Sequence, residues 1–226
     1  MTTGKLYIVA TPIGNLSDIT LRAIETFKKV NFIACEDTRV TSKLLALYNL
    51  KTKLISFNAR NETSKINYVI KKIFEGESCA LVSDAGTPTI SDPGGRLVNE
   101  AKKNGIDVIG IPGANAAILA LSISGLPTDS FLFEGFLPQK KGRQKKLKEL
   151  ATQKRTIVLY ESVHRIEKLI KELNEYMPER LIVIHRELTK IFEETWIGMP
   201  NEILHELPNK TIKGEFVVII APIGWK

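Results

Sequence analysis

The sequence is poor in the residues that would tie it to a metal centre or a disulfide framework. It contains only three histidines and two cysteines, Cys35 and Cys79, and no histidine stands at metal-ligand spacing from a cysteine. No zinc site is therefore expected. Because each cysteine lies in an apolar run, both are predicted to be buried free thiols.

Long hydrophobic segments are also missing. No run of about 18 apolar residues occurs, so no membrane-spanning helix is predicted. The short apolar stretch at the start of the sequence is interrupted by Pro12 and Gly14, unlike the core of a signal peptide. These features predict a cytoplasmic protein.

Three common site fingerprints are absent as well. No GxGxxG follows the first predicted strand, and neither GxxxxGK[ST] nor GxSxG occurs anywhere in the sequence. A nucleotide-dependent dehydrogenase, a P-loop enzyme and a nucleophile-elbow hydrolase are therefore disfavoured.

The composition is that of an ordinary globular protein. Of the 226 residues, 43% are hydrophobic and 25% are charged, which is enough to build one large or two small domains. The formal net charge of +7 permits a polyanionic partner such as nucleic acid, although solvated lysines alone could also account for it.

The first half of the sequence alternates short apolar runs with amphipathic segments. This alternation predicts a largely parallel sheet with a helix after each strand. The predicted strands are 5–10, 31–35, 53–57, 79–82 and 107–111, and the predicted helices are 21–30, 41–48, 64–74 and 95–105. Asp92-Pro93 is interpreted as an N-cap followed by proline at the first helical position, and Gly105 as the cap that closes the same helix.

The rhythm changes after residue 113. A helix of small residues at 115–124 comes first, and a second set of strands follows with helices such as 165–176 between them. The predicted strands are 130–136, 156–161, 180–186, 193–198 and 215–221. We therefore predict an N-terminal α/β domain over 1–113 and a C-terminal α/β domain over 114–226.

Three loops rich in glycine and proline each follow a predicted strand of the first domain. They are ATPIGN (10–15), SDAGTPTISDPG (83–94) and IPGAN (111–115). Each could be an ordinary turn. Because loops beyond the carboxyl ends of parallel strands form the ligand crevice of an open sheet, three such loops together favour a shared binding site.

Polar and basic motifs are the other candidates. In CEDTR (35–39), Glu36 and Asp37 could bind a polar ligand or act as a base, or Asp37 could cap a helix with Arg39 as its partner. The basic stretch KKGRQKKLK (140–148) could be a solvated helix face or could neutralise phosphates. His164 of YESVHR is more readily a structural residue than a catalyst.

Taken together, the motifs resemble a known family. TPIGNLSDITLRA, CEDTR, SDAGTPTISDPG, IPGANA, GLPTDSFLFEGFLP, YESVHR, RELTK and GEFVVII occur in this order along nearly the whole sequence. This ordered set resembles the bacterial ribosomal RNA small subunit methyltransferase I family of the tetrapyrrole methylase superfamily (class III methyltransferases). The resemblance implies two α/β domains with an interdomain cleft, and a homodimer. It further implies S-adenosyl-L-methionine as methyl donor and 2'-O-methylation of a cytidine in 16S ribosomal RNA.

The resemblance also implies roles for individual residues. The residues expected to hold the donor are Pro12, Asp84, Gly86, Thr87, Asn115, Ala116, Leu159, Tyr160 and Phe216, the last through its backbone. The candidate bases are Glu36 and Asp37, followed by Glu187. The residues expected to contact RNA are Arg39, Lys140, Lys141, Arg143, Arg165, Arg186 and Lys190. No metal ion is expected to take part.

One alternative and one departure accompany this resemblance. The alternative is a methyltransferase for a small tetrapyrrole-like molecule, against which the basic charge argues. The departure is that many family members carry a small helical extension after the last strand, which is absent from the printed sequence. We therefore expect RNA to be held by the 140–148 stretch and the dimer surface.

Overall fold

The computed structural model describes residues 3–225 and divides the chain after Asn115 into two compact units. The division falls in the loop 112–115, which also contains the predicted boundary after residue 113. Each unit is an α/β structure with its own five-stranded sheet. The two units are described separately.

The first unit is built on a wholly parallel sheet, as the sequence predicted. Its strands lie in the order β3-β2-β4-β1-β5. Their bounds are β1 (Leu6–Val9), β2 (Phe32–Cys35), β3 (Lys53–Ser56), β4 (Cys79–Val82) and β5 (Val108–Ile111). Every residue of β2 and β4 is buried, which explains why these segments are continuously apolar.

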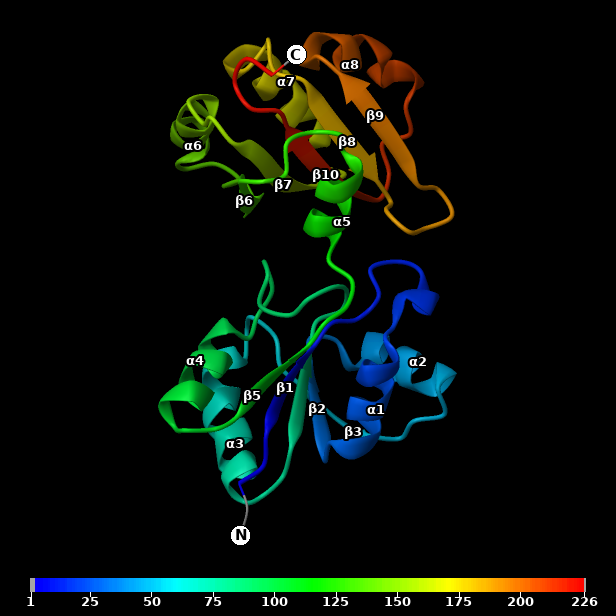
Figure 1. Ribbon diagram of the computed structural model, residues 1–226, viewed down its shortest axis with the longest axis vertical. Helices are drawn as coiled ribbons and strands as arrows, with labels where there is room; N and C mark the ends of the chain where they lie inside the picture. Colours follow the sequence, from blue (N-terminus) through cyan, green and yellow to red (C-terminus); the bar gives the residue numbers. More distant parts are fainter. Residues whose placement is uncertain (1–2, 226) are drawn as a thin grey trace. The chain divides into compact units, whose positions relative to one another are not determined.

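Helices cover both faces of this sheet (Figure 1). One core packs the strands against α1 (Leu21–Lys29) and α2 (Thr38–Leu47), and the other packs them against α3 (Glu62–Phe74) and α4 (Gly95–Lys103). The buried thiols of Cys35 and Cys79 lie in these two cores and are not joined in a disulfide, as predicted.

The start of α4 corrects one prediction. Its N-cap is Gly94, with φ of 120°, and the helix begins at Gly95. Asp92 and Pro93 therefore belong to the preceding loop and are neither the cap nor the first helical residue. The other end agrees with the prediction, because Gly105 adopts φ of 70° just beyond the helix and donates to the carbonyl of Lys102.

The second unit has a mixed sheet with strand order β6-β7-β10-β8-β9. Only β6 and β7 are parallel, and the other neighbours are antiparallel. The bounds are β6 (Phe131–Phe136), β7 (Thr156–Ser162), β8 (Ile182–Arg186), β9 (Glu194–Gly198) and β10 (Glu215–Ile220). The latest strand in the sequence, β10, thus lies in the middle of the sheet.

Helices pack on both faces of the second sheet too. The large core lies against α6 (Arg143–Ala151), α7 (Ile166–Tyr176) and α8 (Pro200–Glu206), the last of which the sequence analysis did not specify. Helix α5 (Ala116–Ile123) contacts β7 and β10. Tyr160 bonds to α5 while its neighbour Leu159 points into the large core, so α5 covers the opposite face. Short 3-10 helices occur at Leu16–Asp18 and Leu207–Asn209.

Among the described residues, no helix is long and apolar enough to span a membrane.

Candidate functional site

The chain path of the first unit changes direction beside β4. The loops after β1 and β2 lead to α1 and α2 on one face of the sheet, while the loop after β4 leads to α4 on the other face. Because β4 lies between β1 and β2, its loop diverges from the loops on both sides. Ligands of open α/β sheets bind at such points, beyond the carboxyl ends of the strands.

Hydrogen bonds join the three glycine- and proline-rich loops at this edge. Thr11 and Gly86 exchange two backbone hydrogen bonds, with N–O distances of 2.9 and 3.0 Å. The Thr11 hydroxyl donates to the carbonyl of Ser83 at 3.2 Å. The Thr87 hydroxyl donates to the carbonyl of Ala114 at 3.1 Å. The loops therefore form one connected structure, with Pro12 buried beside Thr11 and Asn115 half-buried after Ala114.

The long loop after β4 has an unusual backbone. Thr89 and Ser91 adopt positive φ values of 73° and 63°, which cost free energy in residues with side chains. Gly86 also has positive φ, and a Cβ there would lie 3.3 Å from the Ile13 side chain. Gly113, in the loop after β5, lies close to the end of β1, since a Cβ on it would lie 2.9 Å from Ala10 Cβ. These glycines therefore let the loops pack closely against one another.

Carboxylates gather at the same edge. The backbone N–H of Asp37 donates to Asp84 Oδ1 at 2.9 Å and so ties the β2 loop to the β4 loop. Burial raises the pKa values of Glu36, Asp84 and Asp92 above their ordinary ranges. The negative charge of Asp84 raises those of Glu36 and Asp92 further. Such mutual repulsion would be relieved by a cation, so these residues fit a ligand that carries positive charge.

Asp37 differs from its neighbours. Its carboxylate caps α2 by accepting from the backbone N–H of Arg39 at 2.8 Å, and it also forms an ion pair with the Arg39 guanidinium. These hydrogen bonds lower the pKa of Asp37 to about 2. A carboxylate with so low a pKa is a weak proton acceptor, which leaves Glu36 as the better candidate base.

Four of the residues predicted to hold the donor lie in the second unit, namely Ala116, Leu159, Tyr160 and Phe216. Tyr160 presents its side chain at the N-terminus of a helix. Its hydroxyl accepts a hydrogen bond from Ala117 N–H at 3.1 Å, next to Ala116 at the start of α5. Its ring packs against Phe133 and Phe136, with centroid distances of 5.1 and 5.6 Å. Figure 1 shows α5 directly after the loop that leaves β5.

Leu159 and Phe216 lie elsewhere. Both side chains belong to the large core on the α6–α8 face, and Phe216 packs against Trp196. Alternation along β7 turns the side chain of Leu159 away from Tyr160. For Leu159, as for Phe216, the backbone is therefore the remaining candidate for the predicted donor contact.

Two arginines that were predicted to contact RNA are instead bound within the second unit. The Arg143 side chain is only 3% exposed and forms ion pairs with Glu172 at 2.7 Å and Glu161 at 3.5 Å. Arg186 is similarly buried and donates to the carbonyls of Lys213 and Phe192. These guanidinium groups hold the fold together, so the prediction that they bind phosphates is wrong.

The remaining predicted cations fall into two groups. Arg165 is paired with buried Glu161 at 2.8 Å, and Lys190 is paired with Glu187 and Glu215, each at 2.8 Å. Lys140 and Lys141 are exposed, and no ion pair to either is found within residues 3–225. Arg39, paired with Asp37, has an 86% exposed side chain. The exposed cations are therefore the ones available to an anionic partner.

Glu187 is poorly suited to be a base. Burial alone would raise its pKa, but hydrogen bonds from the Lys190 ammonium and the Glu215 N–H lower it below its ordinary range. Its φ of 52° places it in a tight turn after β8. The carboxylate therefore stabilises the turn that carries Lys190.

The comparisons with known proteins agree with this architecture. Residues 5–203 match the family model of the Tetrapyrrole (Corrin/Porphyrin) Methylases. The chain is 50% identical over 224 residues to the Ribosomal RNA small subunit methyltransferase I of Halalkalibacterium halodurans, a match that covers 99% of this chain and 78% of that protein. The chain belongs to this methyltransferase family. A relative of the same name from Thermotoga maritima is 43% identical over 218 residues, covering 96% of this chain and 98% of that protein.

Membership of the ribosomal RNA small subunit methyltransferase I family confirms the resemblance and makes the chain a methyltransferase. Solved structures agree on the fold. Diphthine synthase superposes with a TM-score of 0.75 at 14% identity, covering 96% of this chain and 90% of that one. Uroporphyrin-III C-methyl transferase from Thermus thermophilus, complexed with S-adenosyl homocysteine, gives 0.66 at 18% identity, covering 96% and 97%. The two-unit α/β fold is thus that of the tetrapyrrole methylases.

The sequence analysis overlooked Asp92 as a member of the carboxylate group. A signal was present, because the loop 83–94 contains a second aspartate beside Asp84. Because Asp92 was interpreted as a helix N-cap, it was not proposed as a site residue.

Among residues 3–225, no group of three or more His, Cys, Asp or Glu side chains is arranged to hold a metal ion.

Proposed function

We propose that the protein transfers a methyl group from S-adenosyl-L-methionine to the 2'-oxygen of a cytidine in 16S ribosomal RNA. The observation that carries the proposal is the connected loop structure beside β4, in a chain half identical to a named ribosomal RNA methyltransferase. The finer specificity, for cytidine and for its 2'-oxygen, comes from the family resemblance.

The loops suit this donor in charge and shape. S-adenosyl-L-methionine supplies a methyl group on a positively charged sulfur. Asp84 would stabilise positive charge, since its carboxylate is half-buried and its Oδ1 is fixed by Asp37 N–H. Gly86 lets its loop pack against Ile13, and Thr87 holds the loop to Ala114, so the loop is fixed in place for a ligand. Pro12, Asn115, Ala116 and Tyr160 complete our proposed donor-binding set.

Glu36 is the proposed general base. A ribose hydroxyl is a weak nucleophile, and a carboxylate that accepts its proton would speed the displacement. Glu36 suits this task because burial and the charges of Asp84 and Asp92 raise its pKa above its ordinary range, which makes it a stronger proton acceptor. Most of the remaining rate enhancement would come from holding the hydroxyl in line with the methyl group.

The two carboxylates should then affect different kinetic quantities. The positive charge of the donor disappears during methyl transfer, so a negative charge that stabilises it acts mainly on the bound donor. Asp84 is therefore expected to set donor affinity. Glu36 acts on the proton of the attacking hydroxyl, so it is expected to set turnover.

The experiment combines calorimetry with a methyl-transfer assay on small ribosomal subunits. Asp84→Asn should weaken donor binding at least tenfold, whereas Glu36→Gln should keep it within about twofold and lower kcat by about 10² or more. Asp107→Asn is the control, because Asp107 is exposed at the opposite end of the sheet. No methyl transfer to RNA by the unaltered protein would contradict the proposed function, and unchanged kcat in Glu36→Gln would remove Glu36 as the base.

Cations of both units are the proposed RNA contacts. Lys140 and Lys141 precede α6, and Lys190 lies on the turn after β8. Together with Arg39 and Arg165 they could bind phosphates in the way that phosphate contacts usually position RNA. We further propose that the protein acts in the cytoplasm as a homodimer, which sedimentation of the purified protein would test.

A further inference from the structure

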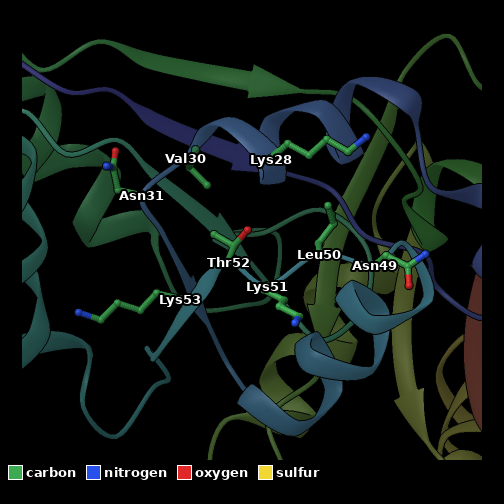
Figure 2. A pocket seen from close by; sticks show the side chains of 8 residues that line it. All are labelled: Lys28, Val30, Asn31, Asn49, Leu50, Lys51, Thr52 and Lys53. Atoms are coloured by element: carbon green, nitrogen blue, oxygen red, sulfur yellow. The ribbon is translucent and has the colours of Figure 1, made fainter.

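A groove of about 610 Å³ lies at the amino end of the first sheet. It is formed by the end of α1, the approach to β2, and the connection between α2 and β3 (Figure 2). The candidate donor loops follow the carboxyl ends of the strands. The groove is therefore at the opposite end of the same sheet from those loops.

Lysines dominate the charge of this groove. Lys28, Lys51 and Lys53 line it and are exposed, and no carboxylate is among the lining residues. No ion pair to any of the three is found within residues 3–225. The groove thus presents positive charge that the described part of the fold does not neutralise.

The helix dipole explains only one of these lysines. Lys28 lies in the last turn of α1, where a cation stabilises the carbonyl end of a helix. Lys51 follows the end of α2, and Lys53 is the first residue of β3. Neither is part of a helix, so the dipole gives no account of their positions.

Two of the three neutral polar side chains that line the groove are bonded within the unit. The Thr52 hydroxyl donates to the carbonyl of Phe27 at 2.7 Å, and Asn31 Oδ1 accepts from Ser78 N–H at 2.8 Å. The first bond joins the start of β3 to α1, and the second joins the starts of β2 and β4. The three lysines, together with exposed Asn49, are the polar groups that can meet a partner.

The directions of the lysines indicate the shape of that partner. Figure 2 shows the side chains of Lys28, Lys51 and Lys53 pointing in different directions. A site for one phosphate would bring its cations to a single point. Cations that are spread out suit a chain with charges at repeated intervals.

We propose that this groove binds the phosphate backbone of the RNA substrate at a distance from the methylated nucleotide. The inference rests on the proposed function, since it assigns a second contact to the same substrate. Because the groove lies at the far end of the sheet from the donor loops, it should contribute to RNA affinity and leave donor binding and turnover at saturating RNA unchanged.

The test compares two triple variants of equal charge. The groove variant carries Lys28→Gln, Lys51→Gln and Lys53→Gln, and the control carries Lys71→Gln, Lys102→Gln and Lys103→Gln. The control lysines are exposed on α3 and α4, the helices of the other sheet face. Binding to small ribosomal subunits is measured from 50 to 300 mM salt, together with KM, kcat and calorimetric donor binding.

The groove variant should lower the slope of log affinity against log salt by about 2, because each lost phosphate contact removes roughly 0.7 to 0.9. If all three lysines contact phosphates, this change in slope corresponds to about 100-fold weaker RNA binding at 0.1 M salt. KM for RNA should rise, with kcat and donor affinity unchanged. Equal slopes for the two variants, with methyl transfer intact in the unaltered protein, would overturn this inference alone. An unaltered protein that neither binds nor methylates small subunits would overturn the proposed function and this inference with it.

Discussion

The substitution Glu161→Gln tests whether the buried ion cluster holds the second unit together. The Glu161 side chain is completely buried and pairs with Arg165 at 2.8 Å and with Arg143 at 3.5 Å. Without this charge, the Arg143 guanidinium remains buried and the Arg165 guanidinium remains mostly buried. Glu172 is then the carboxylate that stays close to Arg143. Breaking a buried pair in this way costs about 3–5 kcal/mol.

The lower end of this range is expected here. Glutamine can still accept the hydrogen bond that Ser162 N–H donates to Glu161 Oε1 at 2.8 Å. Arg143 also keeps its bonds to Glu172 and to the carbonyl of Pro138. We therefore expect a loss of about 3 kcal/mol in the free energy of unfolding of the second unit.

Tryptophan fluorescence during urea unfolding is the assay. Both tryptophans of the sequence, Trp196 and Trp225, lie in the second unit, so the signal reports that unit alone. A loss of 3 kcal/mol should lower the urea midpoint by about 1–2 M. The control Glu149→Gln removes a carboxylate that is 53% exposed and pairs with Lys146, and should cost less than about 0.5 kcal/mol. A Glu161→Gln midpoint equal to that of the control would refute the reasoning.

Two further predictions concern the first unit. Gly86→Ala should lower stability by about 1–2 kcal/mol and weaken donor binding, because the residue has positive φ and its new Cβ would meet Ile13. Gly110→Ala, with no atom within 4 Å, is its control, and equal effects in calorimetry and urea unfolding would contradict the prediction. The low pKa of Asp37, about 2 against an ordinary 3.8, means that its carboxylate adds stability above pH 4 which is lost as the pH falls through 2. Circular dichroism should therefore show the stability difference between the unaltered protein and Asp37→Asn shrinking over that range, and a constant difference would contradict it.

The meeting of the candidate loops could be predicted from the sequence. Strands that alternate with helices predict a parallel sheet, and the carboxyl ends of its strands must share one edge. Loops separated by more than 70 residues, such as those of Thr11 and Ser83, were therefore expected to lie together, and the hydrogen bond between them shows that they do.

The burial and ion pairing of individual charged residues could not be predicted in the same way. Arg143 lies in a run of lysines and resembles them in sequence, yet Glu161 and Glu172, from other elements, draw it into the interior. Such pairing depends on tertiary contacts that no local pattern records. The face to which Leu159 turns could not be predicted for a similar reason, because alternation along β7 shows that two faces differ but not which one α5 covers.

The central place of β10 has a consequence for how the protein is made. The residues of the first unit have all been synthesised by Asn115, so that unit can fold while the rest of the chain is being translated. The second sheet must wait for β10, which follows β6 by roughly 80 residues, or about 4 to 16 s at bacterial elongation rates. During that interval β7 and β8 lack the strand that joins them and expose unpaired backbone N–H and C=O groups along their edges. The second unit is therefore the part of a nascent chain whose strands stay open longest to pairing with another chain.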